Sequence, residues 1–188
     1  MGGQSKARWP TTGKGADPHG DPDAPALARI YSGASIRPTT GKPLTLDQAH
    51  EKIRAALARA AETPRAQWSW GITADEMSGL IALRRRTPTM GTLSYILRED
   101  TWGNGYAIEA AQHVVDFAFA IGGLERLEAM HHPDNPASGR VLTKAGFTRT
   151  GTCDRQTEDW LRSRSVAAFG HRFGRRWRVE ASADVHEK

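Results

Sequence analysis

The chain has 188 residues, of which 38% are hydrophobic and 25% are charged, the size and composition of one globular domain. A net charge of +5 suits an anionic partner, such as a nucleic acid, a nucleotide cofactor or an acidic surface. The single cysteine, Cys153, excludes an internal disulfide framework and a cysteine-based zinc cluster. No stretch has the roughly 20 apolar residues that cross a bilayer, and the first residues lack the apolar core of a signal peptide. We therefore expect a cytoplasmic protein with no metal site and no membrane partner.

The chain is expected to begin with a flexible arm, residues 1–23, which is rich in Gly, Pro, Asp and Lys. Order is expected from Ala24, where apolar residues at helical spacing predict a first helix. Thr45 stands three residues before Gln48, as in a capping box, and predicts the start of a second helix that ends at Pro64.

The periodicity then changes from helix to strand. Alternation over Trp68–Ile72 predicts a strand, and Ser78–Leu83 and Thr92–Arg98 predict two more with a short turn between them. Three consecutive strands joined by short turns indicate an antiparallel meander.

Helices and strands alternate in the second half. The pattern predicts a helix over Ala107–Ile121 that Gly122 and Gly123 end, a strand over Arg126–His131, and a helix from Asn135-Pro136 to Ala145. Phe147–Thr152 is a weaker strand candidate. A strand–helix–strand unit favours parallel pairing of its two strands, so the expected fold is α/β with a mixed sheet.

The segment most suggestive of chemistry is LREDTWGNGYA, from Leu97 to Ala107, where a strand leads through a glycine-containing loop into a helix. Gly103 and Gly105 allow the backbone to turn tightly, and the amides at the helix start can then hold a phosphate or pyrophosphate. The alternative is that both glycines only shape the turn. Ile108 stands where GxGxxG needs its third glycine, and no Gly-Lys-Ser/Thr of a P-loop follows the strand.

Residues Leu93 to Gly151 resemble the GNAT N-acetyltransferases, and within them the RimJ/RimL-like branch. The resemblance rests on two elements about 30 residues apart. The first is Trp-Gly-Asn-Gly-Tyr-Ala over Trp102–Ala107, followed by Glu109-Ala110. The second is Asn135-Pro136-Ala137-Ser138, continued by Val141-Leu142, Lys144 and Gly146-Phe147.

The resemblance implies acetyl-CoA as the acetyl donor and a largely antiparallel GNAT-like sheet, flanked by helices, with a central splay between two parallel strands. The backbone of Tyr95, Ile96 and Leu97 is then expected to pair with the pantetheine arm. The pyrophosphate is expected on the amides of Trp102, Gly103, Asn104, Gly105, Tyr106 and Ala107. Asn135 is expected near the thioester, and Ser138 beside the sulfur.

An amine attacking a thioester must be neutral, which is easier for an α-amino group with a pKa of about 8 than for a lysine of about 10.4. The oxyanion of the tetrahedral intermediate needs a preorganised donor, such as the Leu97 N–H. The departing thiolate needs a proton or hydrogen bond, which is the catalytic role expected of Ser138. The alternative for Ser138 is an ordinary hydrogen bond in the first turn of a helix.

The general base is not identified by the resemblance. Many RimJ/RimL-like proteins carry a glutamate where this chain has Thr150 before Gly151, so that carboxylate cannot be carried over. Glu128, His131 and His132 are candidates by chemistry only. Arg140 and Lys144, one helical turn apart, can meet a CoA phosphate or form an ordinary solvated face.

Both ends depart from the family pattern. No apolar alternation precedes Ala24, and residues 156–188 form a basic segment whose only strand candidates are Val166–Phe169 and Trp177–Val179. The expected organisation is therefore an arm (1–23), an acetyltransferase-like domain (24–155) and this C-terminal segment.

Three functions compete: an N-acetyltransferase acting on a protein N-terminal or small-molecule amine, a non-catalytic acyl-CoA-binding or regulatory module, and a nucleic-acid binder using the basic tail. Nucleic acid is the least favoured partner because no recognition motif supports it, and a homodimer stays open.

Overall fold

The computed structural model describes residues 23–36, 42–73, 76–157 and 160–172. In chain order its elements are α1 (Ala24–Ile30), η1 (Gly33–Ile36), α2 (Leu46–Ala61), β1 (Gln67–Thr73), β2 (Met77–Arg85), β3 (Met90–Leu97), η2 (Glu99–Thr101), α3 (Tyr106–Ala120), β4 (Arg126–His131), α4 (Pro136–Lys144), β5 (Thr148–Thr157) and β6 (Trp160–Arg172). The predicted order of helices and strands is confirmed as far as β5, with element ends displaced by a few residues.

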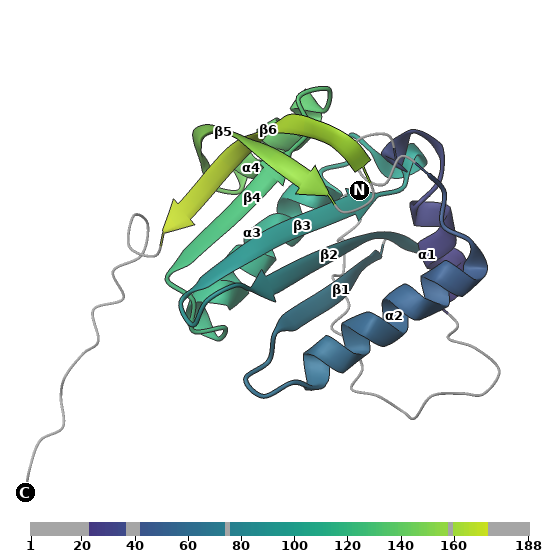
Figure 1. Cartoon of the computed structure of the whole chain (residues 1–188), viewed down its shortest axis with the longest axis horizontal. Helices are drawn as coiled ribbons and strands as arrows, with labels where there is room; N and C mark the ends of the chain where they lie inside the picture. The colour runs from purple at the N-terminus through teal and green to yellow at the C-terminus, as the bar shows by residue number, and fades with distance from the viewer. Residues whose placement is uncertain (1–22, 37–41, 74–75, 158–159, 173–188) are drawn as a thin grey trace, which may run out of the picture.

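The strands form one sheet in the order β1-β2-β3-β4-β6-β5 (Figure 1). Neighbouring strands are antiparallel except for β3 and β4, which are parallel because α3 connects them. The α/β class and the mixed, largely antiparallel sheet are therefore confirmed.

The parallel pair separates before either strand ends. Partners run from Met90 opposite Arg126 to Leu93 opposite Ala129 and stop there. The rest of β3 stays paired with β2, and the end of β4 stays paired with β6. The two central strands therefore part toward their carboxyl ends, which is the splay that the sequence led us to expect.

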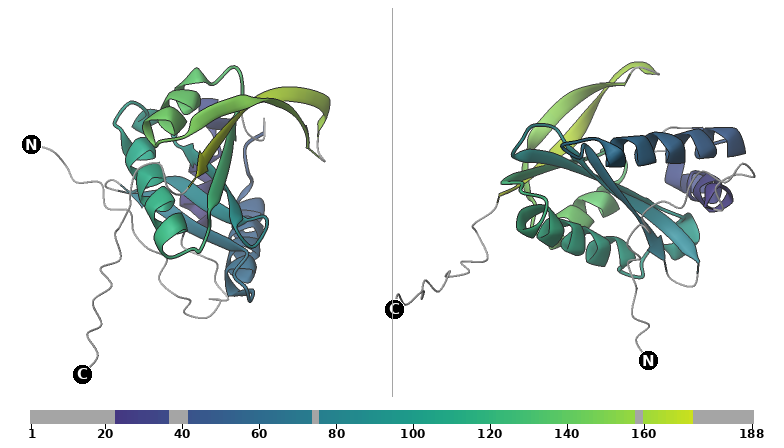
Figure 2. Two further views of the ribbon diagram at one scale, coloured as in Figure 1. Left: turned by 90° about the vertical axis from the view of Figure 1, so that its left-hand side faces the viewer. Right: turned by 90° about the horizontal axis from the view of Figure 1, so that it is seen from below.

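Helices cover both faces of the sheet, as Figure 2 shows. Odd-numbered β3 residues such as Leu93 and Leu97 pack into the larger core against α3 and α4. Even-numbered Ile96 packs into a second core with Leu27 and Ile30 of α1. Two apolar faces on one strand follow from the two-residue period of its side chains and fix the strand between both helical layers.

The helix ends explain why the loops lie where they do. Thr45 and Gln48 form the predicted capping box at the start of α2. Asn135 caps α4 ahead of Pro136, also as predicted. Gly123, just after α3, has a φ of 64°, a left-handed conformation that glycine adopts without steric cost.

The C-terminal part of the sheet is larger than expected. Val166–Phe169 does lie in a strand, but β6 runs from Trp160 to Arg172 and pairs with both β4 and β5. The short-strand prediction for this region was therefore wrong in extent. The arm and the Trp177–Val179 candidate lie outside the described residues, so the proposed domain limits stay predictions. Within the described part of the chain, no helix is long and apolar enough to span a membrane.

Candidate functional site

The site is built around the loop that joins β3 to α3. The chain leaves β3, makes the short helix η2, and turns through Gly103 and Gly105, both with a φ of 83°. Gly105 is the N-cap of α3, and no side chain caps this helix end. Such φ values strongly favour glycine, which explains the Gly-x-Gly spacing in the sequence.

The backbone amides of this turn are available to a ligand. Within the described part of the chain, no hydrogen bond joins the N–H groups of Gly103 through Ala107 to another residue, whereas the next two amides bond to the Gly105 carbonyl. A Cβ on Gly103 or Gly105 would meet nothing within 4 Å. Free amides converging on open space at the start of a helix fit an anion such as a pyrophosphate.

Side chains of the loop hold it in shape. The Trp102 indole Nε1 donates to the Leu97 carbonyl at 3.1 Å, and Asn104 Nδ2 donates to the Thr101 carbonyl at 3.2 Å. The Trp102 amide donates to the Glu99 carbonyl at 3.1 Å, so it differs from the free amides that follow it. The indole of Trp102 is half exposed beside the turn. In this structure Trp102 and Asn104 therefore shape the loop through their side chains.

At the end of β3, alternate residues direct their backbone N–H and C=O groups toward the splay. Arg98 donates its amide to the Ser78 carbonyl of β2 at 2.8 Å, which fixes the alternation along β3. Ile96 therefore directs its backbone groups to β2, and its carbonyl oxygen lies only 2.7 Å from where a Cβ of Gly79 would stand. Tyr95 and Leu97 direct theirs away from β2, toward the open side. The structure thus brings two of the three predicted β3 residues to the splay by their backbone.

Ser138 lies against a residue whose side chain the sequence analysis did not consider. The Tyr95 hydroxyl is 2.7 Å from Ser138 Oγ and 3.1 Å from the Ser138 carbonyl oxygen. Burial, partly offset by the Ser138 hydrogen bond, raises the pKa of Tyr95 to about 12. The tyrosine is therefore neutral at physiological pH. The only sequence signal for this contact is the alternation along the strand, which places Tyr95 on the same side as Leu93 and Leu97.

Asn135 positions Ser138 as well. Its Oδ1 accepts the Ser138 amide at 3.2 Å, which is the N-cap bond of α4. Its amide nitrogen makes no hydrogen bond to any described residue, so it can still donate to a ligand near Ser138. Asn135 and Ser138 thus lie together, as predicted, at the start of α4.

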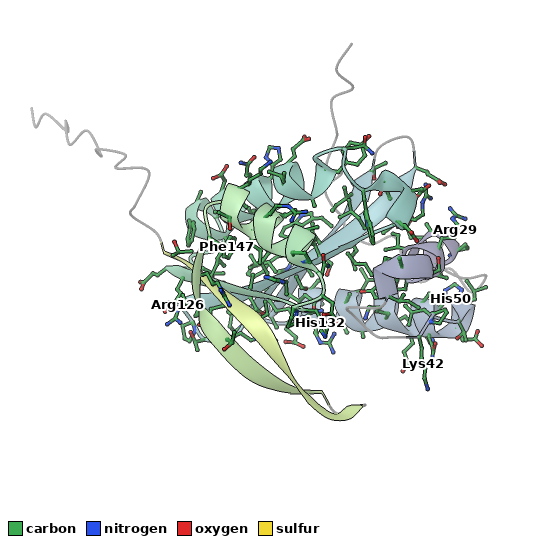
Figure 3. The ribbon with its side chains drawn as sticks, turned by 90° about the horizontal axis from the view of Figure 1, so that it is seen from above. Arg29, Lys42, His50, Arg126, His132 and Phe147 are labelled. Atoms are coloured by element: carbon green, nitrogen blue, oxygen red, sulfur yellow. The ribbon has the colours of Figure 1, made fainter. Side chains whose placement is uncertain are left out.

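The candidate bases are not equally placed. Glu128 forms an ion pair with Arg126 and lies on the opposite side of β4 from Leu127 and Ala129, which enter the larger core. His131, at the end of β4, packs its ring on Gly139 of α4, with Nε2 at 2.7 Å from where a Cβ would stand. Figure 3 labels Arg126 and His132 near the two ends of this strand, well apart. His131 therefore contacts α4 at the residue that follows Ser138.

Two exposed cations lie on α4: Arg140 and Lys144, for which the sequence left open a contact with a CoA phosphate or an ordinary solvated face. Neither forms an ion pair with another described residue. Both stay candidates for that contact.

A cluster of charged side chains lies beside the loop, where Glu76, Arg98 and Asp100 line a depression together with Asn104 and Tyr106. Arg98 pairs with Glu76 and, at 2.6 Å, with Asp100. These hydrogen bonds lower the pKa of both carboxyl groups and raise that of the guanidinium. The cluster ties the end of β3 to the start of β2. It was not found from the sequence, because Glu76 and Arg98 are 22 residues apart and meet only where β2 pairs with β3.

This cluster predicts how stability depends on pH. Carboxyl groups with lowered pKa values stabilise the fold above their unfolded-state pKa, and that contribution is lost as the pH falls through their folded-state values. We expect Arg98→Met to lower the thermal midpoint slightly at neutral pH, because the groups are exposed, and the deficit to vanish in acid. Thermal denaturation across a pH series measures this, with the exposed Arg54→Met as control. A deficit that persists in acid contradicts the prediction.

Comparison with known proteins identifies the family. A profile described as "Acetyltransferase (GNAT) domain" matches residues 17–148. An uncharacterized N-acetyltransferase of Bacillus subtilis, YoaA, is 30% identical over 141 residues, covering 70% of this chain and 77% of YoaA.

Solved structures of low identity share the fold. The microcin C7 self-immunity acetyltransferase MccE, solved with acetyl-CoA and AMP, matches with a TM-score of 0.69 at 13% identity, over 80% of this chain and 87% of that one. RimL, a ribosomal-protein α-N-acetyltransferase solved with coenzyme A, matches with a TM-score of 0.69 at 16% identity, over 80% and 88%. The matched profile spans most of the chain, including the loop, the splay and α4, so this protein belongs to the GNAT acetyltransferase family, whose members transfer acetyl groups from acetyl-CoA.

Proposed function

We propose that this acetyltransferase acts on a primary amine by direct attack in a ternary complex, with a protein N-terminal amine or a small-molecule amine as acceptor. The observation that carries the proposal is the run of free amides from Gly103 to Ala107, at the end of a strand that has parted from its parallel neighbour. This arrangement fits a long donor with a pyrophosphate at one end and a thioester at the other. A RimJ/RimL-like branch is supported by the two sequence elements described above and by the likeness to RimL.

Bound acetyl-CoA supplies an activated acetyl group, and the chain's own groups do the rest. The amides from Gly103 to Ala107 hold the pyrophosphate, and the Tyr95 and Leu97 backbones hold the arm. The Leu97 N–H, which faces the open side of β3, is proposed as the donor to the developing oxyanion. Ser138, fixed by Asn135, donates a hydrogen bond to the departing sulfur.

The proton balance needs no further reactant. The attacking nitrogen loses one proton and the sulfur gains one, so the step consumes none overall. An acceptor that is already partly neutral near pH 8, such as an α-amino group, relaxes the demand on a base. This favours α-amines and weakly basic small amines over lysine side chains as acceptors.

A non-catalytic acyl-CoA-binding module is the second candidate. Thr150 stands where many RimJ/RimL-like proteins carry a glutamate, and Glu128 already forms an ion pair with Arg126. A site without a general base would fit such a module.

The cytoplasmic location and the possible homodimer also stay predictions.

One experiment in two stages separates these functions. Thermal denaturation with and without acetyl-CoA tests donor binding, and thiol release is then followed with peptides bearing free or blocked N-termini and with small primary amines. We expect stabilisation by acetyl-CoA and thiol release with at least one free amine. Stabilisation without release by any amine favours the binding module. If acetyl-CoA neither stabilises the protein nor releases its thiol, and the protein binds RNA in a salt-dependent way, nucleic-acid binding is favoured and the proposal is wrong.

A further inference from the structure

A hydroxyl pair connects β3 and α4 beside the splay. Tyr95 lies two residues beyond Leu93, the last β3 residue paired with β4, and its hydroxyl reaches Ser138 in the first turn of α4. The two hydroxyl oxygens are 2.7 Å apart, and the same tyrosine oxygen is 3.1 Å from the Ser138 carbonyl. Each hydroxyl carries one proton, and either can be the donor in the shorter contact.

Two arrangements of these protons satisfy the geometry. In the first, Tyr95 donates to the Ser138 carbonyl and Ser138 donates to the tyrosine oxygen, so both protons are used within the protein. In the second, Tyr95 donates to Ser138 Oγ, and the serine proton is free to point elsewhere. Only the second arrangement offers a donor to a group in the splay.

We propose that the Tyr95 hydroxyl is a positioning group that holds the oxygen of Ser138 and turns the serine proton toward the sulfur of coenzyme A. This inference rests on the role proposed above for Ser138. The thiolate of coenzyme A accepts a hydrogen bond from the serine hydroxyl. This favours the second arrangement, because a charged acceptor forms a stronger hydrogen bond than a neutral phenol oxygen.

Tyr95 orients the serine and does not itself supply the proton that the sulfur gains. Its burial keeps the phenol neutral, with a pKa of about 12. The proton released by the attacking amine balances the one taken by the sulfur. Removing the tyrosine hydroxyl should therefore change the ionisation of the bound thiol only in a protein that still has the Ser138 hydroxyl.

Two ionisable residues must be considered in a titration of this pair. His131 of β4 packs on Gly139, next to Ser138, and its Nδ1 lies 2.7 Å from the His132 carbonyl oxygen. Arg140 of α4 is exposed. The titration described below is therefore repeated for each protein in a His131→Gln background, where the same order of effects is expected.

The test titrates the thiol of bound coenzyme A by the ultraviolet absorbance of its thiolate, so it needs no acceptor. Four proteins are compared: wild type, Ser138→Ala, Tyr95→Phe and the double variant. Tyr31→Phe, which removes a buried tyrosine hydroxyl from the other core, controls for a general effect of losing such a group. Coenzyme A affinity is measured by calorimetry for each protein.

We expect bound coenzyme A to ionise at lower pH than free coenzyme A in the wild type. Ser138→Ala should reduce the thiolate-to-thiol ratio at a given pH about tenfold, and Tyr95→Phe about threefold. The double variant should match Ser138→Ala, because the tyrosine acts through the serine. Tyr31→Phe should match the wild type.

The other outcomes overturn the inference in distinguishable ways. If Ser138→Ala changes the ionisation of the bound thiol and Tyr95→Phe does not, the serine keeps its proposed role and the positioning role of Tyr95 is wrong. If Tyr95→Phe still acts in the Ser138→Ala background, the tyrosine contacts the sulfur directly. If coenzyme A binds and the wild type leaves its thiol unchanged, the proposed role of Ser138 fails, and the inference fails with it. If coenzyme A does not bind, the proposed function itself is wrong.

Discussion

Replacing Gly105 by valine should weaken acetyl-CoA binding about a hundredfold while the protein stays folded. The added side chain enters the open space onto which the free amides converge, since a Cβ there meets no protein atom. Displacing a phosphate from two charge-assisted hydrogen bonds, at about 1.5 kcal/mol each, accounts for a loss of this size. Calorimetric titration with acetyl-CoA measures it directly.

The substitution also strains the backbone, because Gly105 has a φ of 83°. A side chain in the left-handed region costs about 1–2 kcal/mol. Gly123→Val is the matched control: its φ is 64°, a Cβ there also meets nothing, and it lies beyond the other end of α3. We expect both variants to lose similar stability and only Gly105→Val to lose acetyl-CoA affinity. Equal affinities in the two folded variants would refute a pyrophosphate site on this loop.

Local sequence signals were sufficient for most of the fold. The capping box at Thr45, the proline after Asn135 and the glycines after α3 each act within a few residues, so their effect can be recognised without knowing the tertiary structure. The parallel pairing of β3 and β4 also followed from chain order, because a helix connects them. The glycine loop was located for the same reason, since its backbone conformation depends on Gly103 and Gly105 themselves.

Contacts between distant residues could not be read in this way. Tyr95 and Ser138 are 43 residues apart and meet only because the splay brings α4 next to β3. The ion pair of Arg98 with Glu76 spans 22 residues and depends on the pairing of β2 with β3. The hydrogen bond from the Trp102 indole to Leu97 spans only five residues, but it depends on how the loop folds back on the strand. Burial of the Tyr95 hydroxyl, and hence its raised pKa, is a property of the packed structure alone.

The strand β6 shows the limit of periodicity. Its sequence, WLRSRSVAAFGHR, alternates only weakly between apolar and polar residues, so periodicity predicts no more than a short strand here. It forms because β4 and β5 offer backbone partners on both sides, and such ladder bonds depend little on side-chain type. Tertiary pairing here outweighs a weak local preference.

Ser138→Ala should reduce kcat about a hundredfold and change acetyl-CoA affinity by no more than a few fold, because a donor to the departing sulfur acts mainly in the transition state. A stability loss of about 1 kcal/mol is expected from the missing bond to Tyr95. Thr143→Ala removes a comparable hydroxyl bond from the same helix, to the Gly139 carbonyl at 3.0 Å, and should leave kcat unchanged.

Steady-state kinetics with an amine found by the thiol-release panel, together with calorimetry, separates the possible roles of Ser138. A loss confined to acetyl-CoA affinity would make Ser138 a donor contact without a catalytic role. Unchanged kcat and affinity would leave it an ordinary serine in the first turn of α4, held by Asn135. Ser138 Oγ forms a hydrogen bond with the Tyr95 hydroxyl, whereas Thr143 has no tyrosine partner among the described residues. A reduced kcat is therefore expected for Ser138→Ala and not for Thr143→Ala.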